Sequence, residues 1–138
     1  MKQSQRVILV PTRRGLTEVT AQVVQAVEAA GVREGLCTVF IRHTSASLLI
    51  QENADPAVRA DLELFLSRLV PDGNLMFTHV AEGPDDMPSH VKAALTRTSE
   101  AIPIRDGRLA LGTWQGLYVW EHRTVGRTRE LIVHVAGE

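Results

Sequence analysis

The sequence predicts a single α+β domain over residues 1–138, with mixed sheets and about three helices. Two observations lead to this prediction. Segments with apolar residues at helical spacing alternate with short runs of β-forming residues over about the first hundred residues, and the remainder contains only strand patterns. Helices that are separated from a run of consecutive strands in this way are typical of the α+β class.

A strand and a helix are expected first. Residues 6–10 (RVILV) are a short β-forming run, which predicts a strand that ends before Pro11. Residues 16–30 carry apolar side chains three and four positions apart, which predicts a helix. We expect Thr17 to cap the start of this helix and Gly31 to supply the left-handed residue after its end.

Two strands and a second helix are expected next. Residues 36–44 form a continuous apolar run, which predicts a strand buried on both faces, and residues 45–53 predict another strand. Asp55 followed by Pro56 indicates a helix start, because Asp is a good N-cap and proline suits the first helical position. That helix is expected to end at Pro71. Its inward face is expected to consist of Val58, Leu62, Phe65, Leu66 and Leu69.

A short strand and a third helix are expected before the final strands. Residues 74–80 (NLMFTHV) predict the strand. The helix is expected to begin near Pro88 and to end at about Thr98, with Asp86 as a possible N-cap. Its inward face is expected to consist of Val91, Ala94 and Leu95.

The last third of the chain predicts strands only. Asp106 and Gly107 stand between two apolar runs and indicate a hairpin, because a type I′ turn needs positive φ at both central residues. Residues 116–123 alternate along a further strand, and residues 129–137 form the closing strand. No repeat or linker interrupts this order.

The composition excludes several classes of protein. A net charge of −1 argues against a general nucleic-acid binder. The single cysteine, Cys37, cannot form an intrachain disulfide and fits a reducing compartment. The apolar run at residues 7–10 is too short for a signal peptide, and no run approaches the 18 or so apolar residues that span a bilayer. We therefore expect a cytoplasmic protein without nucleic-acid or membrane partners.

Three histidines stand at the ends of predicted elements, where a rigid scaffold can direct side chains into a shared pocket. His43 and His79 each close a strand, and His90 opens a helix. Neutral imidazoles bind zinc, and a catalytic zinc often has three protein ligands and an open position. Structural roles are the alternative, because single histidines often form only local hydrogen bonds.

The segment HVAEGPDDMPSH places Asp85 and Asp86 between two of these histidines. Carboxylates, water and phosphate oxygens are the ligands that magnesium prefers, so this segment is also a candidate for a hard cation that bridges to a diphosphate. Capping of the following helix by Asp86 is the simpler explanation for one of the two carboxylates.

Further segments carry polar groups suited to substrate binding. HTSAS offers Thr44 and Ser45, whose hydroxyls can bind phosphate; a nucleophilic serine is not supported by any surrounding motif. In LGTWQG, the Trp114 ring can stack on a planar ring and Gln115 can hydrogen-bond it, although a tryptophan between glycines also fits a packed bulge. In EHR, Glu121 and Arg123 share one face of a strand, either as a surface ion pair or as pocket residues.

Several long segments together resemble one family. HTSASLLIQENADPAVRADL, HVAEGPDDMPSHVKAAL, IPIRDGRLALGTWQGLYVWEHR and the closing VAGE are similar to the YjbQ family, also described as the secondary thiamine-phosphate synthase family. The resemblance covers nearly the whole chain and is densest between His43 and Arg123. It implies an α+β fold whose sheets pack around a threefold axis in a homotrimer.

The resemblance also implies an activity and a set of site residues. The activity is a weak or secondary thiamine-phosphate synthase, a transferase that joins hydroxymethylpyrimidine diphosphate to a thiazole phosphate and releases pyrophosphate, normally with magnesium. The substrate is then a phosphorylated small molecule, and the cofactor is a divalent metal, zinc or magnesium. The expected metal ligands are His43, His79, His90 and Asp85; the expected catalytic residues are Asp86, Glu121 and Arg123; the expected substrate-binding residues are Thr44, Ser45, Lys92, Trp114 and Gln115.

Two other functions fit the same residues. One is a metal-dependent hydrolase in which Glu52 or Asp86 acts as the base. The other is a non-catalytic trimer that binds a metabolite or a metal. Turnover distinguishes the first from the second, because a binding module shows saturable binding without product.

Overall fold

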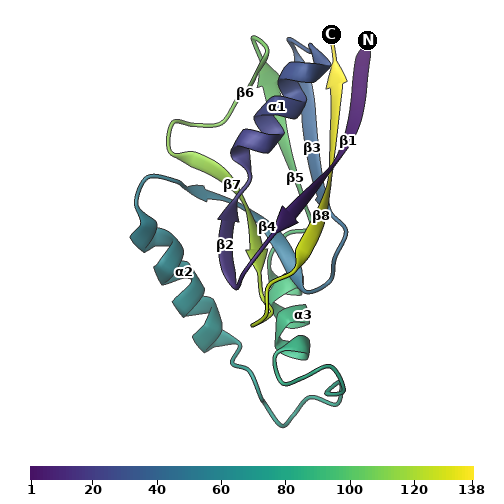
Figure 1. Ribbon diagram of the computed structural model, residues 1–138. Coiled ribbons are helices and arrows are strands. Elements are labelled where there is room, and N and C mark those ends of the chain that lie inside the picture. The colour runs from purple at the N-terminus through teal and green to yellow at the C-terminus, as the bar shows by residue number, and fades with distance from the viewer.

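The computed structural model describes all 138 residues and contains three helices and eight strands, which confirms the predicted α+β class (Figure 1). The elements follow in the order β1 (Lys2–Pro11), β2 (Gly15–Glu18), α1 (Thr20–Ala30), β3 (Gly35–Ile41), β4 (Ala46–Glu52), α2 (Pro56–Leu69), α3 (Asp86–Leu95), β5 (Ser99–Arg105), β6 (Arg108–Leu109), β7 (Gln115–Glu121) and β8 (Thr128–Gly137). None of the helices is long and apolar enough to cross a membrane.

The strands form two sheets. The larger sheet has the order β1-β8-β3-β5-β6, and the smaller has the order β2-β7-β4. Every neighbouring pair is antiparallel, so the prediction of mixed sheets is wrong in this respect. Only β5 and β6 are joined by a short hairpin; the other paired strands are distant in the chain, so their direction is set by tertiary folding and could not be read from the local pattern.

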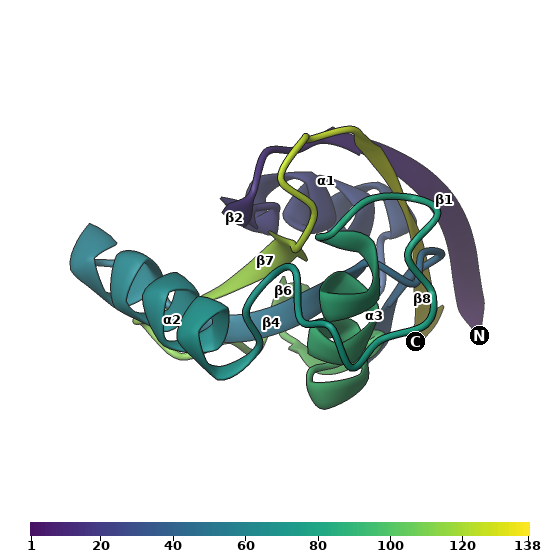
Figure 2. The same ribbon diagram turned by 90° about the horizontal axis from the view of Figure 1, so that it is seen from below.

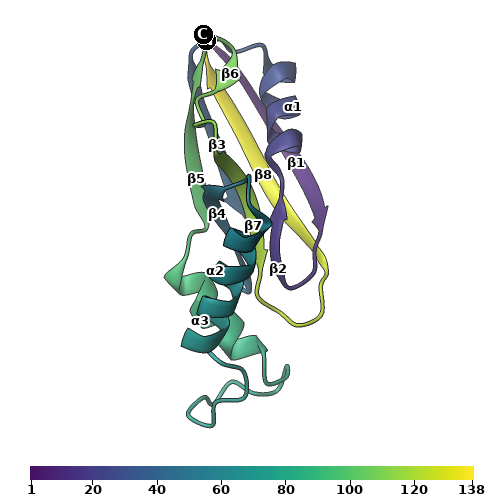
Figure 3. The same ribbon diagram turned by 90° about the vertical axis from the view of Figure 1, so that its left-hand side faces the viewer.

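The hydrophobic core lies between the inner face of the larger sheet, the smaller sheet and α1 (Figure 3). Helix α1 contributes Val23, Ala26 and Val27 to it. Gly31, with φ of 66°, ends this helix in the left-handed conformation, as predicted. The predicted hairpin turn is also confirmed, since Asp106 and Gly107 have φ of 53° and 77°.

The start of α1 differs from the prediction. Residues 15–18 form β2, and Thr17 pairs with Val119 of β7 instead of capping the helix. The N-cap is Val19, which makes no side-chain capping bond. The first residues of the predicted helix instead form an edge strand, because they pair with β7. This tertiary interaction outweighs the local helical pattern.

Helix α2 begins as predicted but exposes most of its apolar face. The Asp55 Oδ1 atom accepts a hydrogen bond from the Ala57 N–H at 2.9 Å. Only Leu66 is buried within the helix, while Phe65 and Leu69 are exposed, so the expected inward face is wrong for these two residues. The helix lies beside the smaller sheet with few neighbours over it (Figure 1).

The predicted strand at residues 74–80 is absent, and these residues belong to the loop that joins α2 to α3. Leu75 is 98% exposed and Met76 is 73% exposed. An apolar run forms a strand only where a neighbouring strand accepts its backbone hydrogen bonds, and neither sheet extends to this loop.

Helix α3 begins at Asp86, two residues before the predicted start, and the Asp86 side chain lies within its first turn instead of capping it. The inward face is also different. Ser89, Lys92 and Ala93 are buried, whereas Ala94 and Leu95 are exposed. The predicted apolar face is wrong because this helix packs partly through polar side chains, and these side chains form the site described below.

Candidate functional site

Two histidines and an aspartate converge at the start of α3. Asp86 and His90 lie four residues apart on the helix, so their side chains share one face. The loop before α3 brings His79 to the same point. The His79 Nε2 atom lies 2.8 Å and the His90 Nε2 atom 3.0 Å from Asp86 Oδ2, and the three ligand atoms all lie within 4.8 Å of one another. This arrangement can hold a metal ion. We call these three residues the triad.

Arg123 holds the second oxygen of the triad aspartate. Its Nη1 donates to Asp86 Oδ1 at 2.7 Å, its Nε donates to Asp85 Oδ2 at 2.9 Å, and its Nη2 donates to the Glu82 carbonyl at 2.9 Å. The hydrogen bond to Asp85 raises the pKa of the Arg123 guanidinium. Because all three guanidinium nitrogens donate hydrogen bonds within the chain, Arg123 orients the two carboxylates. It has no free pair of N–H groups for a substrate phosphate.

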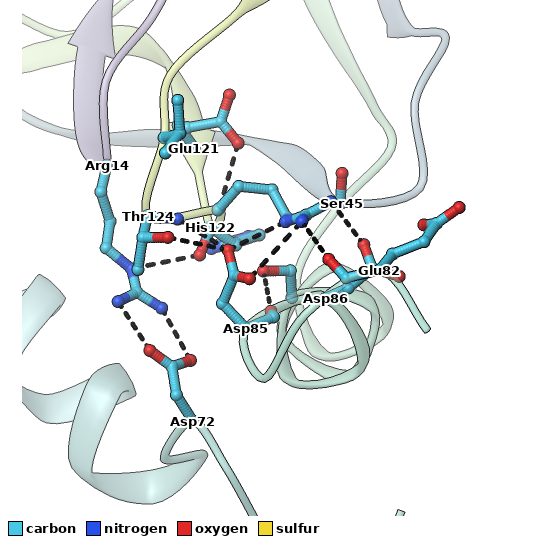
Figure 4. Close-up of polar contacts among 12 residues, drawn as sticks. Arg14, Ser45, Asp72, Glu82, Asp85, Asp86, Glu121, His122 and Thr124 are labelled. Carbon is cyan, nitrogen blue, oxygen red and sulfur yellow. Dashed lines mark hydrogen bonds and ion pairs between the residues drawn. The ribbon is translucent and has the colours of Figure 1, made fainter. Parts of the chain in front are cut away.

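Asp85 is the anchor of the loop. Its Oδ2 accepts hydrogen bonds from the Thr124 N–H at 2.9 Å and the Thr124 hydroxyl at 3.1 Å, as Figure 4 shows. Burial raises the pKa of this carboxyl, but the hydrogen bonds from Arg123 and Thr124 outweigh burial and hold the pKa well below its usual range. Asp85 therefore stays ionised, and it lies outside the triad.

The Thr44 carbonyl determines which nitrogen of His90 carries a proton. The His90 Nδ1 lies 2.9 Å from this carbonyl oxygen, which only accepts hydrogen bonds, so Nδ1 is protonated. In neutral His90 the lone pair of Nε2 then faces the Asp86 carboxylate. Two lone pairs at 3.0 Å repel each other unless His90 is an imidazolium or a cation lies between them.

His43, the third predicted histidine ligand, is used elsewhere in this chain. Its Nε2 accepts a hydrogen bond from the Glu130 N–H at 2.7 Å, so its lone pair is engaged by the backbone. Burial lowers the pKa of His43, and the nearby Arg129 cation lowers it further. The next residues contribute to the surroundings of the triad instead: Thr44 through its carbonyl, and Ser45 through bonds to Arg129.

Glu121 lies next to the site but is fully buried. Its carboxylate accepts hydrogen bonds from Arg129 Nε at 2.8 Å and from the Thr12 hydroxyl at 2.6 Å. Burial raises the pKa of Glu121, and these hydrogen bonds outweigh that effect and lower it. The carboxylate is therefore an ionised structural partner of Arg129 without an open path to a substrate.

A second polar group lies between the smaller sheet and the helices. The His122 Nε2 and Ser47 Oγ atoms are 2.8 Å apart, and both side chains are fully buried. The His122 Nδ1 atom has no partner, so the third group of a catalytic triad is missing. Lys92 is also buried nearby, and burial lowers the pKa of its ammonium group. His122 and Ser47 are thus buried structural residues, and Lys92 belongs to the buried face of α3.

Trp114 and Gln115 lie at the opposite end of the smaller sheet from the triad. At about 3.3 Å per residue, the length of β7 separates Gln115 from Glu121 by roughly 20 Å. Glu52, one of the two candidate bases, pairs with Gln115 and lies at that same end. Within one chain these three residues and the triad are therefore not brought together.

Several site residues were not anticipated from the sequence. Arg129 opens the predicted closing strand and has no expected role in the site, yet it is 3% exposed and ion-paired with Glu121. Arg14 forms a bidentate pair with Asp72, with both N–O distances 2.9 Å, and so connects the loop after α2 to the turn between β1 and β2 (Figure 4). The cluster of arginines at residues 123–129 was the available signal, but its pairing depends on contacts distant in sequence.

His122 makes stability depend on pH. Burial lowers the pKa of the imidazole to about 3, and the Lys92 cation contributes, whereas a histidine in the unfolded chain has a pKa of about 6.5. The unfolded state therefore binds the proton more strongly, and stability is lost as the pH falls from about 6.5 toward 3. We expect His122 ring signals in NMR spectra to stay unchanged from pH 8 to 5.

His122→Phe serves as the matched comparison, because it removes the titrating group. Urea unfolding of this variant should show a flatter fall in unfolding free energy between pH 6.5 and 4.5 than the parent protein. A His122 titration midpoint above pH 5 contradicts the inferred burial.

Comparison with known proteins places the chain in a family. The family model of UPF0047 protein YjbQ-like matches residues 5–138. UPF0047 protein sll1880 of Synechocystis sp. is 52% identical over 99% of this chain and 94% of its own length, and UPF0047 protein YjbQ of Escherichia coli O157:H7 is 44% identical over 91% of each chain.

Solved structures agree with the sequence comparison. A YbjQ-like protein of unknown function from Sulfolobus solfataricus P2 superposes with a TM-score of 0.91 at 26% identity over 99% of both chains. An uncharacterised conserved protein of the YjbQ/UPF0047 family from Clostridium acetobutylicum has a TM-score of 0.86 at 34% identity, over 95% of this chain and 99% of its own. The chain therefore belongs to the UPF0047 family of YjbQ-like proteins.

Proposed function

We propose that the protein is a metal-dependent hydrolase whose metal ion is held by His79, Asp86 and His90. The observation that carries this proposal is the orientation of His90: its Nδ1 donates to the Thr44 carbonyl while its Nε2 faces the Asp86 carboxylate. A divalent cation between the two atoms turns a repulsive contact into two coordination bonds. Carbonyl partners of this kind commonly orient histidine ligands of metal sites.

The charges around the triad also favour a cation. Asp85 and Asp86 are both ionised, and Arg123 is their only close cationic partner, so neutral histidines leave a negative balance. A divalent ion compensates it. Two imidazoles and one carboxylate oxygen are a donor set typical of zinc and of other transition metals, whereas magnesium prefers oxygen ligands and several waters.

The proposed chemistry divides between the metal and the chain. A bound zinc ion supplies water activated near neutral pH, since such water has a pKa of about 7. Asp86 would hold the ion through Oδ2, together with His79 and His90, while Arg123 fixes the other Asp86 oxygen. His79 is half-exposed, which leaves a face of the triad open to a substrate. Glu52 lies at the far end of β4, and both oxygens of Asp86 are engaged, so Asp86 would serve as a ligand and not as the base.

The thiamine-phosphate synthase activity has less support from this geometry. That reaction needs a diphosphate site beside a pyrimidine site. Arg123 is already engaged by Asp85 and Asp86, and Trp114 and Gln115 lie roughly 20 Å along the sheet from the site. The activity stays a prediction from the resemblance, and a non-catalytic binding module stays its alternative.

We also propose that the chain forms a homotrimer through the outer face of the larger sheet. Val7 and Phe40 flank Ile132 in one cross-strand row, and Leu9 and Leu36 lie on the same face. All four of these β1 and β3 residues are 45–65% exposed, which is unusual for apolar strand residues. The expected burial of the β3 region on both faces is wrong for the single chain and is consistent with an interface. Sedimentation equilibrium at micromolar concentration tests this proposal, and a monomer refutes it.

The metal centre predicts one zinc per chain. Metal-free protein titrated with zinc by calorimetry should bind about one ion, and His79→Ala, Asp86→Asn and His90→Ala should each weaken binding more than about 100-fold, since loss of outer partners alone costs 10- to 100-fold. Two controls are informative. Asp61→Asn changes an exposed carboxylate of α2 and should bind normally, and so should His43→Ala if the triad is complete without it.

Circular dichroism should show that each variant is folded. Zinc binding that survives in both Asp86→Asn and His90→Ala contradicts the proposed ligands. Loss of zinc in His43→Ala, with the fold intact, instead restores the predicted set that includes this residue.

The hydrolase proposal predicts turnover that follows the metal. On a panel of phosphoesters and carboxylic esters, the zinc-loaded protein should release product, chelation should abolish the activity, and added zinc should restore it. His90→Ala should lose at least about 100-fold of kcat/KM. The same preparations, supplied with hydroxymethylpyrimidine diphosphate and thiazole phosphate plus magnesium, manganese or zinc, test the synthase activity directly. Saturable binding without product in every assay favours the binding module.

A further inference from the structure

An apolar cavity of about 320 Å³ adjoins the triad. It lies between the loop that joins α2 to α3 and the first turn of α3, where Figure 2 shows the loop curving past the helix. Its walls include Leu75, Phe77, His79, Val80, Met87 and Pro88. No residue outside this loop and the helix start takes part.

The side chains that line the cavity are mainly apolar, and none is a lysine, an arginine or a carboxylate. Leu75, Phe77, Val80 and Met87 supply aliphatic and aromatic surface, and His79 is the only titratable residue among the lining residues. The side-chain Oδ1 atom of Asn74 accepts a hydrogen bond from the Met76 N–H at 3.0 Å. No lysine or arginine lines the cavity, so it offers a phosphate or a carboxylate no charged partner.

His79 belongs to both the cavity and the triad. Its Nε2 lies 2.8 Å from Asp86 Oδ2, while the same ring forms part of the cavity wall. Met87 and Pro88 of the wall follow Asp86 directly in the sequence. A group seated in the cavity therefore lies against the triad, and a polar head attached to that group reaches the metal position.

We propose that this cavity binds a single uncharged ring of the substrate, aromatic or aliphatic, whose attached oxyanion or ester head lies at the triad. An enclosed apolar cavity of about 150 Å³ accommodates benzene, and the cavity here, which is open to solvent beside the exposed Leu75 and Val80, has room for one ring and a short linker. The substrate class is thus a small apolar ring that carries a phosphate or ester group. This inference rests on the proposed function, because the triad and its metal determine where the head of the substrate lies.

Two probes that differ only in the ring test the proposal. Methylphosphonate and benzylphosphonate present the same head, and calorimetry with zinc-loaded protein measures the affinity of each. Burial of one ring is worth about tenfold or more in affinity, so benzylphosphonate should bind at least about tenfold tighter. Equal affinities of the two probes overturn the proposal.

Substitutions in the cavity wall test whether the preference for benzylphosphonate arises at this cavity. Phe77→Ala and Met87→Ala each remove part of the wall and should reduce the advantage of benzylphosphonate to below about threefold, while methylphosphonate and zinc bind as before. Phe65→Ala is the matched control, since it removes an exposed phenyl group from α2, outside the cavity. An unchanged ring preference in both cavity variants contradicts the assignment.

A metal-free measurement separates the cavity from the metal. The methyl NMR signal of Met87 should shift with benzyl alcohol and not with methanol, and Phe77→Ala should weaken that response. If the protein binds no zinc but shows this response, the cavity assignment stands and the metal proposal fails. If zinc binds and neither ring probe is preferred, the metal centre stands and the cavity assignment fails.

Discussion

The buried ion pair between Glu121 and Arg129 is the interaction on which the arrangement of the site depends. It joins the last residue of β7 in the smaller sheet to β8 in the larger one, and Ser45 and Thr12 complete its hydrogen bonds. Such a pair adds little net stability, but removal of one partner costs about 3–5 kcal/mol because the other charge stays buried. The ion pair therefore fixes the position of one sheet relative to the other at the point where β7 and β8 meet.

The site extends directly from that junction. Two residues after Glu121, Arg123 leaves the sheet and binds both aspartates at the start of α3. Those contacts hold the loop before the helix in place, and the loop presents His79 to Asp86. The position of Arg123 thus depends on the sheet junction, the positions of the two carboxylates depend on Arg123, and the positions of the histidines depend on the carboxylates. Preorganisation of this kind is what a metal centre requires of its supporting residues.

The residues of the triad could be named from the sequence, but the separate role of each residue could not. HVAEGPDDMPSH contains all three triad residues, and from its histidines and aspartates the sequence predicts a metal site, which stays a prediction. The sequence could not separate Asp86, which faces the histidines, from Asp85, which anchors the loop to Thr124. Neighbouring carboxylates look equivalent in a sequence, and the direction of each side chain depends on partners 37 to 39 residues away.

The sequence by itself determined the α+β class and those features that local chemistry controls: the helix start at Asp55 and Pro56, the end of α1 at Gly31 and the turn at Asp106 and Gly107. Each depends on backbone preferences within one turn of chain. Only the tertiary structure decided that residues 15–18 pair as a strand, that residues 74–80 do not, and which histidines meet at Asp86. Those outcomes depend on partners distant in the chain, and local pattern carries no information about such partners.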